Sequence, residues 1–247
     1  MQSEKYSYRY TRFYTNEFPE MLKEFDYRGK VVLDLGAGDG EILYGLDNNF
    51  WLEEAKRVIA IEISPMRCKL LKKEATNFLT KIEVHCADAT MLRGLIYNKT
   101  VDIIICNQVI EHIKDEDLLI AEIYRIMKPG AVCYLSTVFK EPFNFAYHHN
   151  EAGMRVLDPT HLREYTDNSL FHKLHNLFAI PRAKKLLQWF AVTDFILGRL
   201  KIMGHVYEDH KWLAWLRKFK LPIVGCYNWE MVLIMPARAD EVPQKLQ

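Results

Sequence analysis

A glycine-rich turn directly after a short apolar strand constrains this chain more than any other feature. Residues 30–42 read KVVLDLGAGDGEI, an apolar, β-branched run followed by glycine at every second position. The apolar run suits a central strand that is covered on both faces. Glycines without Cβ atoms let the backbone turn sharply and approach a ligand closely; they are Gly36, Gly38 and Gly40. A helix is expected to begin at about Asp39, with its N–H groups directed into the same crevice.

The spacing of the glycines separates two kinds of nucleotide site. A dinucleotide fingerprint, G-x-G-x-x-G, requires a third glycine for close packing of helix and strand. Counted from Gly36, that position holds Glu41, whose carboxylate obstructs the packing and repels phosphate. The pattern that fits is D-x-G-x-G-x-G, from Asp34 to Gly40. An acid beside the turn suits a ligand that carries an amino group and a sulfonium cation, so an NAD-dependent oxidoreductase is disfavoured.

This pattern resembles motif I of the class I S-adenosylmethionine-dependent methyltransferases, in the small-molecule branch similar to methyltransferase type 11. The resemblance covers residues 30–139 and, more loosely, HLREYT at residues 161–166. It implies that the cofactor is S-adenosyl-L-methionine and that S-adenosyl-L-homocysteine is the product. The donor-binding residues that it implies are Asp34, Gly36, Ala37, Gly38, Glu62, Ile63, Asp88, Ala89, Asn107 and Gln108.

Polar residues at the ends of the next three strands fit this resemblance. Glu62, at the tip of RVIAIEI, can accept hydrogen bonds from both ribose hydroxyls of an adenosyl ligand, and the alternative is a solvated strand-end acid. In the resembled family an acid at the place of Asp88 accepts from the adenine amino group, and the alternative is a turn-forming aspartate. Asn107 and Gln108 follow VDIIIC and should face the methyl donor, because the crevice of a parallel sheet lies beyond the carboxyl ends of its strands.

Five strand–helix repeats predict the fold class. We expect an α/β protein with a Rossmann-like, doubly wound, mostly parallel seven-stranded sheet and helices on both faces. Residues 1–29 are expected to form an N-terminal helical and aromatic segment, whose helix runs from Asn16 to about Tyr27. Residues 30–247 are expected to form the methyltransferase domain.

The C-terminal half of the chain is expected to complete the sheet and to supply the acceptor side. Thr166 is predicted to cap a helix from Asp167. Strands are predicted at 179–190 and at 228–239, with the last one antiparallel. The segment between them is too long for a hairpin connection, and about 191–227 is predicted to be a helical cap insertion.

Residues 139–166 have neither helix nor strand periodicity and are expected to form an acceptor-side loop. Within them, HLREYT is similar to a stretch of small-molecule and glycan-type methyltransferases. If the acceptor is a hydroxyl, a neutral imidazole beside it can take the proton, and His161 is the first choice, with His148 and His149 behind it. The alternatives are that His161 only orients the loop, and that transfer needs no base because the sulfonium is already activated.

Composition and missing motifs disfavour several other classes of function. A formal charge of +1 over 247 residues argues against general polyanion binding, and the N-P-P-Y/F tetrad of many nucleobase methyltransferases is absent, so no nucleic-acid partner is expected. No bilayer-length apolar run and no N-terminal signal core are present, which favours a cytoplasmic protein. The five cysteines are dispersed without C-x-x-C, and no metal site is predicted, since zinc needs three or four convergent ligands.

We therefore predict an S-adenosylmethionine-dependent methyltransferase that acts on a small-molecule or saccharide acceptor, at a hydroxyl. One alternative is a quinone- or lipid-linked acceptor at a membrane surface, and another is a family member that binds cofactor or a partner without catalysis. The membrane alternative rests on an apolar helical face beside basic residues, although core or cap packing is favoured for it; the face comprises Trp212, Trp215, Leu216 and Phe219. Nothing in the sequence indicates an oligomeric state.

Overall fold

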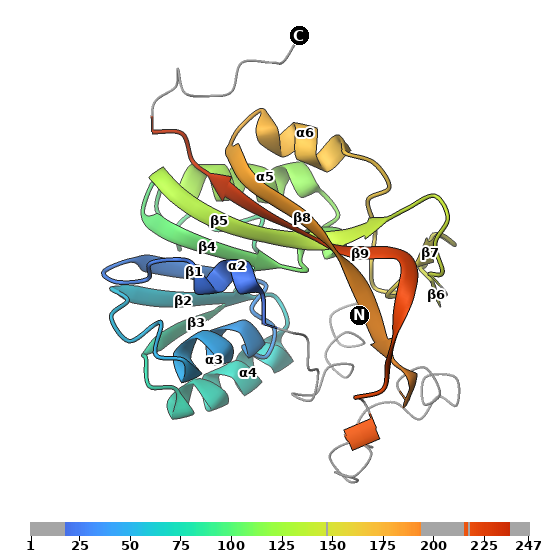
Figure 1. The fold of residues 1–247 in the computed structure, drawn as a ribbon. Coiled ribbons are helices and arrows are strands. Elements are labelled where there is room, and N and C mark those ends of the chain that lie inside the picture. Colours follow the sequence, from blue (N-terminus) through green and yellow to red (C-terminus); the bar gives the residue numbers. More distant parts are fainter. Residues whose placement is uncertain (1–17, 147, 194–214, 217, 238–247) are drawn as a thin grey trace.

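A seven-stranded sheet forms the centre of the molecule (Figure 1). The computed structural model describes residues 18–146, 148–193, 215–216 and 218–237. The strands of the sheet are β1 (Val31–Leu35), β2 (Arg57–Glu62), β3 (Ile82–Cys86), β4 (Val101–Asn107), β5 (Met127–Lys140), β8 (Ala179–Ala191) and β9 (Lys220–Ile234). Their order is β3-β2-β1-β4-β5-β9-β8, in which β1 to β5 are parallel and β9 is antiparallel to both of its neighbours. This confirms the predicted mostly parallel sheet.

Helices cover both faces of the sheet, as predicted (Figure 1). Successive strand residues point to opposite faces, so Val32 and Leu33 of β1 belong to two separate cores. The core around Val32 is closed by α2 (Glu20–Lys23), α3 (Glu41–Asn48) and α4 (Pro65–Glu74). The core around Leu33 is closed by α5 (Glu116–Ile126) and α6 (Ser169–His175). Two 3₁₀ helices, η1 (Ala75–Asn77) and η2 (Ile110–His112), follow α4 and β4. No helix in the described ranges is long and apolar enough to span a membrane.

Two predicted helix boundaries are wrong. The N-terminal helix ends at Lys23, because the chain then turns to bury Tyr27, whose hydroxyl donates to the Leu22 carbonyl at 2.7 Å; Asn16 lies outside the described residues. The helix predicted to be capped by Thr166 begins only at Ser169. The preceding residues are held on β5, since the Tyr165 N–H donates to the Val138 carbonyl at 3.1 Å.

The predicted helical insertion is wrong for residues 220–227, which belong to β9. β8 and β9 form an antiparallel ladder that extends to the pair of Ala191 and Lys220, although the connection is long. Pro222 and Gly225 obscure the strand pattern in the sequence, whereas pairing with a distant partner satisfies the backbone. Residues 194–214 and 217 of the predicted insertion lie outside the described residues.

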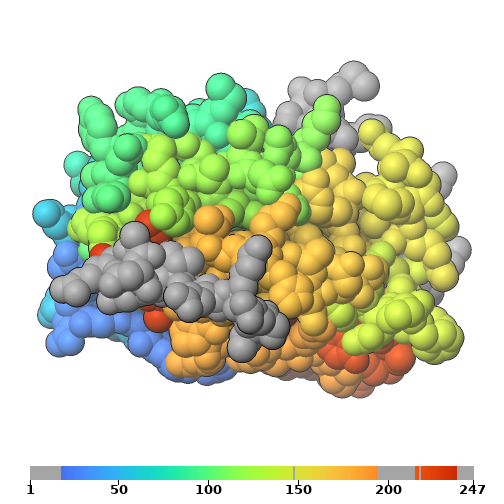
Figure 2. All heavy atoms as spheres, turned by 90° about the horizontal axis from the view of Figure 1, so that it is seen from above, coloured from blue at the N-terminus to red at the C-terminus, as the bar shows by residue number. Residues whose placement is uncertain are grey.

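The acceptor-side segment, residues 139–166, packs along β9 and contains a two-stranded ribbon, β6 (His148–His149) with β7 (Arg155–Val156). In the space-filling view this yellow segment lies beside the orange residues of α6 and β8 (Figure 2). The Glu141 N–H donates to the Gly225 carbonyl at 2.8 Å, and the Phe145 N–H donates to the Val224 carbonyl at 3.1 Å. These two hydrogen bonds dock the acceptor-side segment onto β9 and fix the point at which it leaves the sheet.

Gly225 is the position on which this docking is expected to depend. Its φ is +76°, and a Cβ atom there would lie 2.1 Å from the Phe143 carbonyl oxygen. Gly130 has φ +75° and nothing within 4 Å, so it offers a matched control. Gly225→Ala should lower the free energy of unfolding by about 2–5 kcal/mol, and Gly130→Ala by only about 1–2 kcal/mol of backbone strain. Urea unfolding measures both values, and equal losses would contradict the close approach.

Candidate functional site

The carboxyl ends of four parallel strands form one edge of the sheet, and the residues predicted to bind the donor lie along it. The register sets Leu35 beside Ile61, and Glu62 beside Cys86. Parallel pairing therefore brings the end of β1 next to that of β2, and the end of β2 next to that of β3. The predicted donor-binding residues at this edge are Asp34, Gly36, Ala37, Gly38, Glu62, Ile63, Asp88, Ala89, Asn107 and Gln108.

The Glu62 carboxylate joins the glycine turn to the end of β2. Its Oε2 accepts from the Gly38 N–H at 2.9 Å, and its Oε1 accepts from the Ser64 N–H at 2.8 Å. The Ala37 N–H continues the pairing by donating to the Ile61 carbonyl at 2.9 Å. Glu62 is only 4% exposed, so it is not the solvated strand-end acid that the sequence left open.

The glycine turn leaves space that no other residue would leave. Gly36 has φ +69°, and a Cβ atom there would lie 2.6 Å from Val109 Cγ2. Gly38 has φ +59°, and its nearest neighbour to such an atom is the Arg67 side chain at 3.2 Å. Close packing against Val109, which lies between β4 and η2, therefore requires glycine at the first position. The second glycine keeps the backbone open to the crevice.

Asp34 is a buried carboxyl group beside this turn. It is 2% exposed, and its Oδ2 has no hydrogen-bond partner among the described residues. Burial, and then the neighbouring Glu62 carboxylate, raise the pKa of Asp34 to about 8. A ligand amino group would give this carboxylate both a donor and a positive charge. The site thus fits the amino acid end of S-adenosylmethionine.

The predicted residues that follow β2 and β3 differ in exposure and in hydrogen bonding. Ile63 follows Glu62 with its side chain 58% exposed, whereas Ala89 is buried. Asp88 Oδ1 accepts from both the backbone N–H and the hydroxyl of Thr90, at 2.8 and 2.7 Å. That oxygen therefore serves the turn, which is the alternative that the sequence left open for Asp88.

Asn107 and Gln108, at the end of β4, contact residues of β5, β9 and η2. Asn107 Oδ1 accepts from the Ser136 hydroxyl at 2.7 Å. Gln108 has a left-handed backbone, with φ +55°. Its amide lies between two groups, 2.8 Å from Asn228 Oδ1 and 2.9 Å from Glu111 Oε1.

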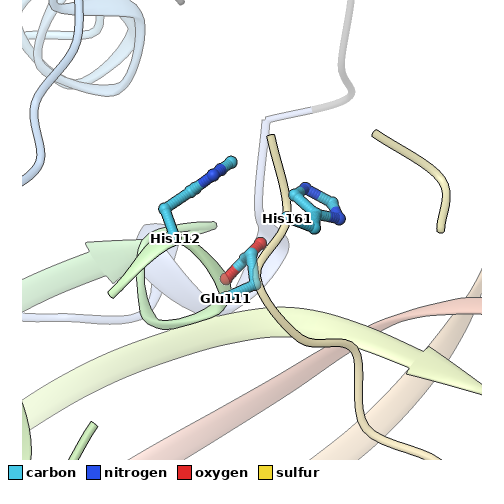
Figure 3. Close-up of side chains that lie close together, drawn as sticks. All are labelled: Glu111, His112 and His161. Atoms are coloured by element: carbon cyan, nitrogen blue, oxygen red, sulfur yellow. The ribbon is translucent and has the colours of Figure 1, made fainter. Parts of the chain in front are cut away.

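His161 lies in a buried group of ionisable side chains. The other two members, Glu111 and His112, belong to η2, which follows β4. Figure 3 shows it together with Glu111 and His112, and the ligand atoms of the three residues all lie within 4.8 Å of one another. The Nδ1 atom of His161 is 2.5 Å from Glu164 Oε1. Burial alone would lower the pKa of His161, but its hydrogen bond to the Glu164 carboxylate and the charge of Glu111 raise it overall.

The two neighbours of His161 are also shifted from their ordinary pKa values. Burial raises the pKa of Glu111 to about 7, against the opposing effect of His161. Burial, and then the charge of His161, lower the pKa of His112 to about 4. At neutral pH the group therefore presents a neutral His112 ring beside two partners that share charge and protons.

Sequence reasoning missed Glu111 and Glu164 as members of this site. Two features of the sequence could have indicated them. Glu164 follows His161 by three residues, and Glu111 is an acid inside the stretch NQVIEHI. The structure places His148 and His149 on β6, outside the group formed by Glu111, His112 and His161.

Comparisons with known proteins agree with this geometry. Residues 33–135 match a family model described as methyltransferase domain. The chain is 30% identical over 151 residues to phosphoethanolamine N-methyltransferase 1 of Triticum aestivum, covering 60% of this chain and 28% of that protein. It is 26% identical over 168 residues to ubiquinone biosynthesis O-methyltransferase of Coxiella burnetii, covering 68% and 64%. It therefore spans less than two thirds of either relative.

A solved structure shows the same fold across nearly the whole chain. The crystal structure of a SAM-dependent methyltransferase from Aquifex aeolicus superposes with a TM-score of 0.59 at 15% identity, covering 95% of this chain and 98% of that one. The family match spans the strands that carry the glycine turn and Glu62. On this sequence match and this fold, residues 33–135 are similar to a methyltransferase domain, and the chain has the fold of the class I methyltransferases.

Proposed function

We propose that the protein transfers a methyl group from S-adenosylmethionine to a hydroxyl of a small molecule or saccharide. The observation that carries the proposal is the buried Asp34 carboxyl, whose Oδ2 has no hydrogen-bond partner among the described residues, beside a glycine turn that Glu62 holds in place. A carboxyl in that position gains a partner when an amino group enters the crevice. No phosphate-binding arrangement offers that match, since phosphate would be repelled by Asp34 and Glu62 alike.

The donor is proposed to lie along the carboxyl ends of β1 to β4. Gly36, Ala37 and Gly38 would face its amino acid part, because their backbone approaches the crevice without side chains in the way. Glu62 already accepts two backbone N–H groups, and the other lone pairs of its oxygens can accept the ribose hydroxyls. The remaining proposed contacts are Ile63, Asp88 and Ala89 around the adenine, and Asn107 and Gln108 beside the methyl group.

The acceptor is proposed to lie between the end of β4 and the segment of residues 139–166. His161 is the proposed catalytic residue on this side, because it lies beside Glu111 and His112 of η2, which follows β4, and its ring is held by Glu164. The bound donor supplies a methyl group on a positively charged sulfur, so orientation of the acceptor and loss of its proton are what the protein must provide. His161 can assist proton loss directly or through a bound ion.

A quinone-type acceptor is the second candidate. The Coxiella burnetii relative is a ubiquinone biosynthesis O-methyltransferase. Large apolar side chains also lie exposed towards the far end of the β8–β9 ladder, where Trp189 is 54% and Leu221 51% exposed. Such a surface suits an apolar acceptor or a membrane surface better than a sugar.

Asp34→Asn should separate stability from donor binding. Because the pKa of Asp34 is raised from 3.8 to about 8, the ionised form is disfavoured in the folded protein, and the free energy of unfolding falls as pH rises between those values. The ligand-free variant should therefore be more stable than the wild type at pH 7.5, by about 1–3 kcal/mol, with the gain shrinking towards pH 4. Its affinity for S-adenosylhomocysteine should fall about 10-fold or more.

Urea unfolding at the two pH values and calorimetric titration with S-adenosylhomocysteine measure these effects. A variant that is less stable at pH 7.5, or one that binds the product with full affinity, would remove the proposed contact between Asp34 and the amino group.

Turnover should depend on His161. The protein is incubated with S-adenosylmethionine and a panel of phenols, quinols, sugars and phosphoethanolamine, and release of S-adenosylhomocysteine is measured. At least one hydroxyl acceptor should give release. His161→Ala should lower its kcat about 100-fold or more, while the affinity for S-adenosylhomocysteine stays unchanged.

His172→Ala, on the exposed side of α6, is the matched histidine control and should keep full rate. Release with no acceptor in the panel would favour a family member that binds cofactor without catalysis. Full activity of His161→Ala would remove the proposed role of that residue.

A further inference from the structure

Glu111, His112 and His161 converge from two segments that are far apart in sequence. Glu111 and His112 belong to η2, directly after β4, and His161 lies in the acceptor-side segment. One ligand-type atom of each residue lies within 4.8 Å of the others (Figure 3). Ligands around a tetrahedral zinc ion are about 3.4 Å apart, given Zn–N and Zn–O bonds of about 2.1 Å. Small side-chain rotations would therefore bring the three atoms onto one ion.

Hydrogen bonds to backbone carbonyls of residues 111–114 hold the two segments in this position. The Leu162 N–H, next to His161, donates to the carbonyl of Glu111 at 2.9 Å. The Arg163 guanidinium donates to the carbonyls of Ile113 and Lys114, at 2.7 and 2.6 Å. The convergence is thus built into the chain trace rather than into side-chain conformations alone.

Both histidines have the outer contacts that metal-ligating histidines show. In such sites the ring nitrogen that does not bind the metal faces a carboxylate or a backbone carbonyl. Nδ1 of His161 lies 2.5 Å from Glu164 Oε1, and Nδ1 of His112 lies 3.3 Å from the Thr160 carbonyl oxygen. These contacts favour the tautomer that presents Nε2 of each ring as the ligand atom. Glu164 is itself fixed by Lys140, at 3.0 Å.

The carboxylate of the group is buried without a lysine or arginine partner. Glu111 is 0% exposed, and its Oε2 accepts from the Thr137 hydroxyl at 3.0 Å. Within the described ranges no lysine or arginine forms an ion pair with it, whereas Glu164 has Lys140. A buried carboxylate is costly unless a positive charge or a proton accompanies it. A divalent cation would supply that charge.

We propose that Glu111, His112 and His161 bind one divalent transition-metal ion, with Zn²⁺ the best match. Two imidazoles and one carboxylate are the protein ligands of one class of catalytic zinc sites, which keep a fourth position for water or substrate. The sequence predicts no metal site because its ligands are distant in the chain: His112 and Thr160, the neighbour of His161, are 48 positions apart. Folding alone brings these ligands together.

The role of the ion in methyl transfer rests on the proposed function. Binding of the ion to the three residues does not depend on that function. An acceptor hydroxyl at the fourth position would lose its proton more readily, because the cation stabilises the oxygen anion. The O–H bond breaks and the proton passes to solvent. The oxygen then forms a C–O bond to the methyl group as the S–CH₃ bond breaks, and that electron pair remains on the sulfur as a thioether. His161 acts here as a ligand and not as the base.

Zinc binding is tested on the full chain after removal of any affinity tag and treatment with a chelator. Calorimetric titration with Zn²⁺ should give one ion per chain, and Co²⁺ should give a visible absorption band typical of a four-coordinate site. His112→Gln and His161→Gln should each weaken Zn²⁺ binding about 100-fold or more, and Glu164→Gln about 10–100-fold because the contact that orients the His161 ring is weakened. His172→Ala, the exposed control on α6, should bind as the wild type does.

Thermal unfolding and S-adenosylhomocysteine affinity are measured on each variant, so that folding and donor binding are followed separately. Wild-type protein that takes up no stoichiometric Zn²⁺ or Co²⁺, or folded His112→Gln and His161→Gln variants that keep full affinity, would overturn the metal site and leave the methyltransferase proposal standing. Zinc binding without any donor binding would support the site and overturn the proposed function.

Discussion

The structure depends on one carboxylate that joins two neighbouring strand ends. Glu62 accepts from the N–H groups of Gly38 and Ser64, so the glycine turn after β1 and the start of α4 share a single acceptor. Charge-assisted hydrogen bonds of this kind are stronger than neutral ones, and burial strengthens them further. Burial raises the pKa of Asp34, and the Glu62 carboxylate raises it further. Glu62 therefore contributes both to the geometry of the turn and to the electrostatic preference for a cationic ligand.

The acceptor side has a comparable dependence on buried charge. Lys140, at the end of β5, pairs with Glu164 at 3.0 Å, and Glu164 in turn fixes the ring of His161. All three are nearly buried. Removing one member would leave another charge unpaired in a low-dielectric environment, which is costly. The segment that closes the acceptor side is therefore held by polar contacts as well as by apolar packing, and its position is tied to β4 through Glu111.

Local sequence signals predicted strands β1 to β5 well and the C-terminal part of the fold poorly. Strands β1 to β5 and the Glu62 position follow from apolar runs, glycine spacing and caps, which act over a few residues. The start of β9 does not, because Pro222 and Gly225 oppose strand formation locally and only the ladder with β8 overrides them. The partners of His161 do not follow from local signals either. Glu111 and His161 come together only because the acceptor-side segment docks onto η2, which is a non-local contact.

The central claim is that the crevice at the ends of β1 and β2 holds the adenosyl donor. A crystal structure grown with S-adenosylhomocysteine tests it most directly. We expect continuous density for the ligand there, with the ribose hydroxyls about 3 Å from the Glu62 carboxylate and the amino group at the same distance from Asp34. Density absent from this crevice at saturating ligand, or the ligand bound elsewhere on the sheet, would contradict it.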